Sequence, residues 1–160
     1  MRQDRFLIGI LAGIGILVLL SLGLFFLRRA DLAYGPEDTP EGVVRNYVIA
    51  LQKQEMERAY RYLAEGENKP NQAVFNQALE QYQLREISTA SLQVDNSVID
   101  GETATVYLVI VRGQNEPFGT GFREQQNALL ELQNGAWKIK MMPYPYWGFD
   151  WYNVPLKPEP

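Results

Sequence analysis

The feature that most constrains this chain is an unbroken apolar run near its start, from Phe6 to Leu27. Ser21 is the only polar side chain in these 22 residues. As a helix, the run would rise about 33 Å at ~1.5 Å per residue, enough to cross the ~30 Å hydrocarbon core of a bilayer. A surface helix of a soluble domain would need a polar face, which this run lacks. We therefore expect residues 6–27 to form a single transmembrane helix in contact with the lipid bilayer.

A cleaved signal peptide is the alternative interpretation of this run. Its apolar region would span about 7–15 residues and end at small residues. The run here is longer and ends in large side chains followed by Arg28 and Arg29, so we favour an uncleaved anchor. Arginines flank both ends of the span, which leaves the positive-inside rule close to a tie. The short segment ahead of the span favours a cytoplasmic N-terminus and an extracytoplasmic domain.

Two glycines in the span, Gly9 and Gly13, form a GxxxG pattern. Small residues at this spacing let two membrane helices approach closely. The pattern is also frequent by chance in apolar runs. We name Gly9 and Gly13 as the candidate residues for helix packing in the membrane.

Composition removes several classes of function. The chain contains no histidine and no cysteine, which excludes Ser-His-Asp and Cys-His nucleophiles and zinc sites built from those residues. Four of the 15 basic and one of the 19 acidic residues lie in residues 1–29, so the remainder has 11 basic and 18 acidic side chains. An acidic domain repels phosphates, so we expect no nucleic-acid partner. No EF-hand or phosphate-binding loop occurs in the sequence, and we expect no metal and no cofactor.

Helical patterns follow a short tether over residues 30–38. Thr39-Pro40-Glu41 predicts a helix start, with Thr39 as the N-cap, a proline at the first position and an acid in the first turn. Tyr62 falls off the helical spacing, and we expect it to be partly exposed. A weaker pattern, with Ala73, Val74, Leu79 and Tyr82, predicts a further helix from Asn71 to Tyr82. The two strongest buried stripes are Val43, Val44, Tyr47, Val48 and Leu51, followed by Met56, Ala59, Tyr60 and Leu63.

Period-two patterns in the second half predict about four antiparallel strands joined by hairpins. Asp100-Gly101 and Asn134-Gly135 are tight-turn signals between them. The glycine-spaced residues 113–121 are interpreted as a hairpin connection. The expected strands are Glu86–Ile99 with Leu92, Val94, Asn96 and Val98 on one face, Thr103–Arg112, Phe122–Gln133, and Ala136–Met142 with Trp137, Ile139 and Met141 on one face. Helices followed by such strands predict an α+β domain, with helices packed on a curved antiparallel sheet.

Two stretches carry a family resemblance. Residues 39–65, TPEGVVRNYVIALQKQEMERAYRYLAE, resemble the opening helices of nuclear-transport-factor-2-like domains, and NGAWKIKMM, residues 134–142, resembles their last hairpin. The resemblance implies a cone-shaped fold with a helical lid over a bent sheet and a cavity that some members use. It does not imply a function, because function depends on the site rather than the fold.

The resemblance leaves a catalytic alternative open. Enzymes of this kind commonly use a His–Asp pair, which is absent here, or an Asp with a Tyr acid inside the cone. The candidate acids in this sequence are Asp95, Glu124, Glu131 and Asp150, and each is better interpreted as a solvated charge. We assign no catalytic residue.

Six of the ten residues from Pro143 to Tyr152 are aromatic. Pro143 and Pro145 should end the sheet near Met142. The tail could wrap over its own domain, dock on another protein, or lie at the bilayer interface. We expect the part up to Trp147 to fold back on the sheet and the part from Phe149 to meet a partner. The candidate partner-binding residues are Tyr144, Tyr146, Trp147, Phe149, Trp151 and Tyr152.

The sequence therefore predicts a single-pass membrane protein with four parts. These are an anchor over residues 1–29, a tether over 30–38, a cone-shaped domain over 39–142 and an aromatic, proline-rich tail over 143–160. We expect a non-catalytic binding or assembly domain, an accessory subunit of a larger membrane protein complex. The alternative is a small-ligand-binding or enzymatic cone domain that uses an Asp or Glu and a Tyr in its cavity.

Overall fold

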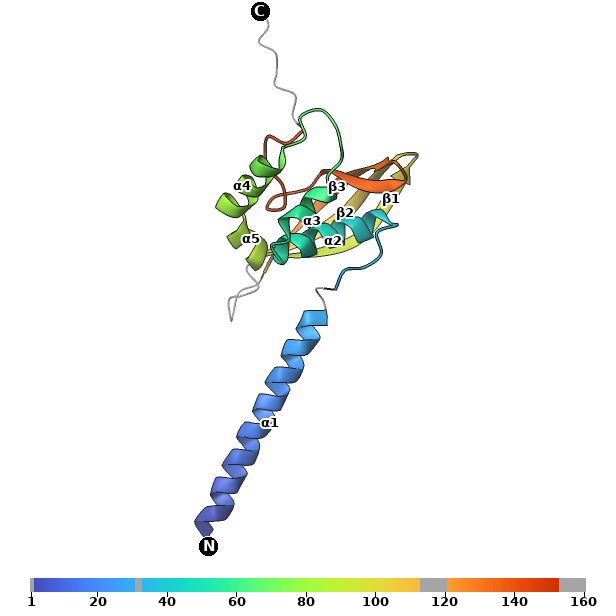
Figure 1. Cartoon of the computed structure of the whole chain (residues 1–160). Coiled ribbons are helices and arrows are strands. Elements are labelled where there is room, and N and C mark those ends of the chain that lie inside the picture. Colours follow the sequence, from blue (N-terminus) through green and yellow to red (C-terminus); the bar gives the residue numbers. More distant parts are fainter. Residues whose placement is uncertain (1, 31–32, 113–120, 153–160) are drawn as a thin grey trace, which may run out of the picture. The chain divides into compact units, whose positions relative to one another are not determined.

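The computed structural model describes residues 2–30, 33–112 and 121–152 (Figure 1). The chain divides into two compact units, Met1–Ala33 and Tyr34–Pro160. The first unit is one helix, α1 (Arg2–Ala30). Within it, Leu7–Leu24 has a mean hydropathy of 2.7 and is long and apolar enough to cross a membrane. The predicted apolar helix is thus present, and its side chains from Leu7 to Leu24 are exposed within the unit.

The second unit is an α+β domain of two layers, as predicted. Its helices lie on one face of a twisted four-stranded sheet (Figure 1). The sheet is an antiparallel meander in the order β1-β2-β3-β4. The helices are α2 (Pro40–Gln52), α3 (Met56–Arg61), α4 (Gln72–Tyr82) and α5 (Leu84–Thr89), and the strands are β1 (Ser91–Asp100), β2 (Thr103–Arg112), β3 (Phe122–Gln133) and β4 (Ala136–Met141).

The start of α2 follows from its capping residues. The Thr39 hydroxyl oxygen accepts a hydrogen bond from the Gly42 backbone N–H at 3.1 Å, and Pro40 occupies the first turn. The helix then buries the whole predicted stripe, Val43, Val44, Tyr47, Val48 and Leu51. The segment before the cap is also held, because the Asn46 side chain bonds both the N–H and the carbonyl of Gly35, at 2.8 and 2.9 Å. The second unit therefore includes residues 34–38.

The chain after α3 covers the outer edge of β4. Leu63 forms a parallel bridge with Ile139. The Ala64 N–H donates to the Ile139 carbonyl at 2.9 Å, and the Ile139 N–H donates to the Tyr62 carbonyl at 2.8 Å. These bonds satisfy an edge that would otherwise expose unpaired backbone groups. They also fix the end of α3 beside β4.

The same edge pairing corrects the prediction for two tyrosines. Tyr62 is 6 % exposed, whereas Tyr60 is only partly buried. The helix ends at Arg61, so Tyr62 no longer follows the helical period and turns inward with the edge segment. On α4, the predicted positions Ala73 and Val74 are exposed, and Phe75 and Leu79 carry the buried face instead.

The first strand also differs from the prediction. Residues 84–89 form helix α5, so the strand begins at Ser91 rather than Glu86. A bulge follows, because the pairing shifts between Val94–Leu108 and Ser97–Val106. The extra residue reverses the alternation of faces. Asn96 and Val98 are therefore exposed, although the uninterrupted period placed them on the inner face.

The last two strands match their predicted bounds to within a residue. The turn between them has positive φ at Asn134 (51°) and Gly135 (78°), as a tight hairpin requires. The pairing of β3 with β4 shifts register between Leu129 and Leu130, so the alternation of inward and outward side chains changes at the end of β4. Trp137 and Ile139 are buried as predicted, but Met142 is buried in place of Met141, which is only partly buried. The predicted connection at residues 113–120 lies outside the described residues.

Trp137 tests the inward face of β4. The side chain is 9 % exposed and belongs to the core cluster, so Trp137→Ala should lower the free energy of unfolding by about 3–5 kcal/mol. Phe122→Ala on β3 is the matched control, since Phe122 is 68 % exposed and should cost about 0.5 kcal/mol or less. Chemical unfolding followed by circular dichroism measures both. Equal losses would show that the face assignment is wrong.

Candidate functional site

The aromatic tail packs into the core of its own domain. Tyr146, Trp147 and Trp151 are 0, 8 and 6 % exposed. The Tyr47 hydroxyl of α2 donates to the Tyr146 carbonyl at 2.7 Å, a fully buried bond across the domain. The Gln83 side-chain amide donates to the Trp147 carbonyl at 2.8 Å. The tail backbone is thus bonded from α2 and from the junction between α4 and α5, and Tyr146 is fully buried in the core.

The second half of the tail packs on α4. The Trp151 ring stacks on Phe75 with centroids 5.1 Å apart and meets Trp147 edge-on at 4.9 Å. A Cβ at Gly148 would lie 2.4 Å from the Trp151 indole, so only glycine fits at this bend. The Tyr152 hydroxyl donates to the Ala64 carbonyl at 2.5 Å. Residues 146–152 therefore close the core from the helical side of the sheet, and Trp151 lies inside its own domain.

Two of the six candidate partner-binding residues remain on the surface. Tyr144 is 37 % exposed and Phe149 is 80 % exposed. Their rings stack with centroids 6.1 Å apart. The Arg112 guanidinium donates to the Tyr144 carbonyl at 3.0 Å and lies 5.2 Å from its ring centroid. Tyr144 and Phe149 border a surface groove of about 390 Å³, the tail groove, whose other walls include Met141, Trp147 and Tyr152.

The candidate acids do not converge on one site. Glu124 lies 3.7 Å from Arg112, and Glu131 lies 3.3 Å from Lys140. Asp95 and Asp150 are exposed. Within the described residues, no group of three or more carboxylates could hold a metal ion.

A different carboxylate does face a tyrosine. The Tyr62 hydroxyl donates to Glu37 Oε1 at 2.6 Å, and the Arg58 guanidinium lies 3.3 Å from the same oxygen. Arg58 also donates to the Tyr62 hydroxyl at 3.3 Å and lies 3.3 Å from the ring centroid of Tyr34. This cluster was not predicted from the sequence, because Glu37 lies in the predicted tether and Tyr62 was expected to be partly exposed. One feature of the sequence does indicate a charged cluster: Arg58 and Arg61 are three residues apart, which places them on the same side of a helix.

The cluster forms one wall of a cavity of about 440 Å³, here called the α3–β4 pocket. The pocket lies where the edge pairing holds the end of α3 against β4. Its lining comprises Glu37, Val43, Arg58, Arg61, Tyr62, Ala136, Trp137 and Lys138.

The electrostatics of this pocket oppose proton transfer. The hydrogen bond from Tyr62 lowers the pKa of Glu37, with Arg58 adding to the shift. Burial, and then the bond to Glu37, raises the pKa of Tyr62. At neutral pH the carboxylate is therefore ionised and the phenol protonated. These are the protonation states that a carboxylate base with a tyrosine acid would need. Both pKa values nevertheless move away from neutral pH, which makes Glu37 a weaker base and Tyr62 a weaker acid, so the shifts fit a binding pocket better than a reaction centre.

Gly9 and Gly13 both lie on α1. A Cβ built at either position has no neighbour within 4 Å. Each therefore offers room for a close approach, and their role in helix packing stays a prediction.

Comparisons with known proteins concern the fold. Neither family models nor curated protein sequences match this chain. Among solved structures, it is similar to a SEC-C motif containing protein from Rhodopseudomonas palustris, at 14% identity and a TM-score of 0.45, over 66% of this chain and 77% of that one. Two proteins from Novosphingobium aromaticivorans are also similar. One, a nuclear-transport-factor-2-like protein with a cystatin-like fold, has 13% identity and a TM-score of 0.45, over 75% of this chain and 82% of that one. The other, an uncharacterized cystatin fold protein, has 11% identity and a TM-score of 0.43, over 66% and 97%. No residue role is transferred from them.

The burial of the tail generates a paired prediction. Trp151→Ala should lower the free energy of unfolding by about 3–5 kcal/mol, because it removes the ring that stacks on Phe75 and leaves a cavity in the core. Phe149→Ala should change it by about 0.5 kcal/mol or less, because that ring is 80 % exposed. Chemical unfolding of the full-length protein in detergent, followed by circular dichroism, compares the two. A stable Trp151→Ala protein would contradict the packing of the tail.

Proposed function

We propose that this chain is a membrane-anchored, non-catalytic binding domain that serves as an accessory subunit of a larger membrane protein complex. The observation that carries the proposal is the occupied interior of the cone. The Tyr146 side chain is fully buried there, and its backbone carbonyl accepts a hydrogen bond from the Tyr47 hydroxyl. A domain filled by its own chain binds partners at its surface.

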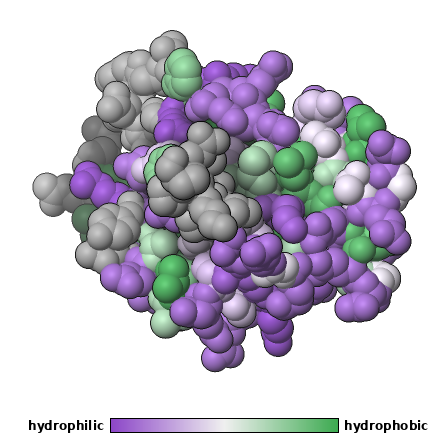
Figure 2. All heavy atoms as spheres, turned by 90° about the horizontal axis from the view of Figure 1, so that it is seen from above, coloured by the Kyte–Doolittle hydropathy of each residue, from purple (hydrophilic) through white to green (hydrophobic). Residues whose placement is uncertain are grey.

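The tail groove is the surface we assign to the partner. Tyr144 and Phe149 line it, and aromatic residues are enriched at protein interfaces. Arg112 lies outside the groove and holds the Tyr144 carbonyl at 3.0 Å. The tail backbone that carries Tyr144 and Phe149 is held in place because its neighbours Trp147 and Trp151 are buried in the core. Such a surface loses little entropy on binding, because it is already ordered. The face in Figure 2 is mostly hydrophilic with separate hydrophobic patches, which favours local recognition over one broad apolar interface.

The partner is a protein that shares the membrane. In this proposal α1 spans the bilayer, Gly9 and Gly13 allow a neighbouring helix to approach, and the domain lies on the extracytoplasmic side. The acidic balance of the domain favours a protein surface over an anionic lipid surface, which would repel it. Two weak contacts on one chain, at the span and at the groove, then reinforce each other through effective concentration.

The anchor has a direct test. After an alkaline carbonate wash, the full-length protein should stay in the membrane pellet, while a chain that starts at Tyr34 should be soluble and folded. Protease added outside spheroplasts should digest the domain of the full-length protein. Recovery of the full-length chain in the soluble fraction, or protection of the domain until lysis, would contradict the anchor or the orientation respectively.

The partner contact is tested by matched aromatic pairs. Tyr144→Ala with Phe149→Ala should abolish co-purification of membrane proteins with the tagged full-length chain in mild detergent. Tyr107→Ala with Phe122→Ala is the control, since those rings are 46 and 68 % exposed on the sheet. Both double variants should keep the melting temperature within a few degrees. Retention of the same partners by the tail variant, or their loss from the control as well, would refute the groove as the contact.

A further inference from the structure

The α3–β4 pocket has an excess of positive charge. Arg58, Arg61 and Lys138 face a single carboxylate, Glu37, in its lining. Glu37 is already paired with Arg58 at 3.3 Å and bonded to Tyr62. This pocket is locally positive, whereas the rest of the domain is mainly acidic. Anions are therefore attracted to the pocket more than to other parts of the domain.

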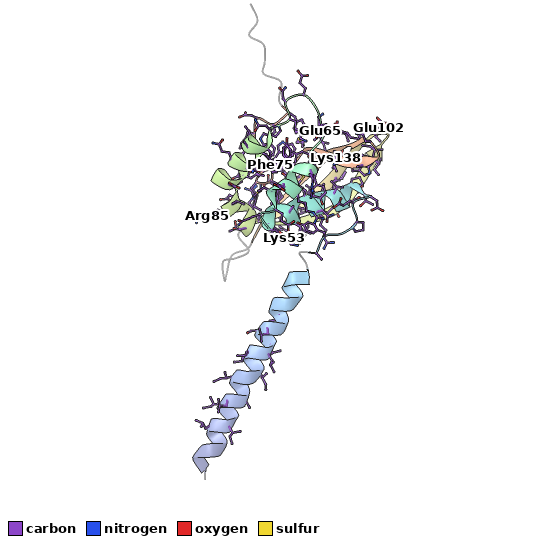
Figure 3. The ribbon with its side chains drawn as sticks, in the orientation of Figure 1. Lys53, Glu65, Phe75, Arg85, Glu102 and Lys138 are labelled. Atoms are coloured by element: carbon purple, nitrogen blue, oxygen red, sulfur yellow. The ribbon has the colours of Figure 1, made fainter. Side chains whose placement is uncertain are left out.

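Two of the three cations are free to take an anion. Within the described residues Arg61 forms no ion pair, and its side chain is exposed. The Lys138 ammonium donates one hydrogen bond, to the Arg61 carbonyl at 2.8 Å, which leaves two donors. It also contributes to the lowered pKa of Glu37, so it lies within electrostatic reach of that carboxylate. Figure 3 labels Lys138 among the side chains of the α+β domain.

The remaining lining is apolar. Val43 and Trp137 are buried core residues that reach the pocket, and Ala136 lies beside them. A volume of about 440 Å³ is in the range of small-molecule sites. A ligand that fits these walls has one acidic group for each of the two cations and a short hydrocarbon body that contacts the apolar residues.

We propose that the α3–β4 pocket binds a small dicarboxylic acid. Arg61 takes one carboxylate through its planar fork, and Lys138 takes the other. Trp137 and Val43 contact the hydrocarbon body. The two cations come from different elements, Arg61 from α3 and Lys138 from β4, which suits a ligand with two carboxylates. The pocket is distinct from the tail groove, so this proposal does not depend on the partner contact.

Glu37 sets the sign of the key test. Its carboxylate is paired with Arg58 at 3.3 Å and repels a second carboxylate that enters the pocket. Glu37→Gln should therefore tighten binding of the dicarboxylate at least threefold, while the amide oxygen can still accept the bond from Tyr62. Arg61→Gln and Lys138→Gln should each weaken binding at least tenfold, as expected for the loss of a charge-assisted hydrogen bond. A residue with a merely structural role would not produce opposite signs.

The experiment uses the full-length protein in detergent, titrated with succinate by calorimetry and by thermal shift at matched ionic strength in chloride. Arg85→Gln is the control, because it removes one exposed positive charge on α5 outside the pocket. Wild type and control should show the same saturable binding. The melting temperature of each variant without ligand identifies any folding defect, and Arg61→Gln carries the test if Lys138→Gln is unstable.

Four outcomes would overturn the proposal. They are no saturation by millimolar succinate, equal binding by Arg61→Gln and wild type, tighter binding of inorganic phosphate than of succinate, and stronger binding to vesicles containing phosphatidylserine than to succinate. The third outcome would assign the pocket to a phosphate. The fourth would assign it to a lipid headgroup.

Discussion

The buried hydrogen bond from the Tyr47 hydroxyl to the Tyr146 carbonyl is the contact on which the rest of the domain depends. It joins α2 to a segment 99 residues away and directs that segment into the space between the helices and the sheet. Burial raises the pKa of Tyr47, so the phenol stays a donor through the physiological range. Once Tyr146 is seated, Trp147 and Trp151 can pack beside it, and Phe75 on α4 gains its stacking partner. One polar bond therefore organises an aromatic core drawn from three parts of the chain.

Filling the interior in this way moves recognition to the outside of the cone. The tail groove and the α3–β4 pocket differ in chemistry. The groove has aromatic rings and thioether side chains supported by the core. The pocket has three cations around one carboxylate, with an apolar floor. The edge segment at residues 62–64 joins β4 by backbone bonds, and β4 leads into the tail. The two surfaces thus lie on one continuous stretch of the structure, although each is proposed for a different class of ligand.

Local chemistry determined which elements were predictable. The start of α2 follows from Thr39 and Pro40, β2 follows from its β-branched residues after the Asp100-Gly101 turn, and the end of β3 follows from the Asn134-Gly135 turn, so these bounds were predicted correctly. The bulge in β1 was not, because an extra residue leaves no composition signal and reverses every later face. Tyr62 was misplaced because α3 ends one residue earlier and the chain turns to pair with Ile139. The pocket brings together Glu37 and Lys138, which are 101 positions apart, and only the folded edge pairing relates them. The burial of Trp151 depends on the same kind of distant contact, with Phe75.

The position of Tyr146, Trp147 and Trp151 in the chain has a consequence for biosynthesis. These residues are made after every strand of the sheet, yet they complete the core. While they are still inside the ribosome or a translocation channel, the helices and the meander already outside have an open interior lined by Tyr47, Phe75 and Leu79. The nascent domain therefore exposes an apolar hollow until its own last turns arrive. During that interval, the uncovered apolar surface makes the nascent domain prone to aggregation.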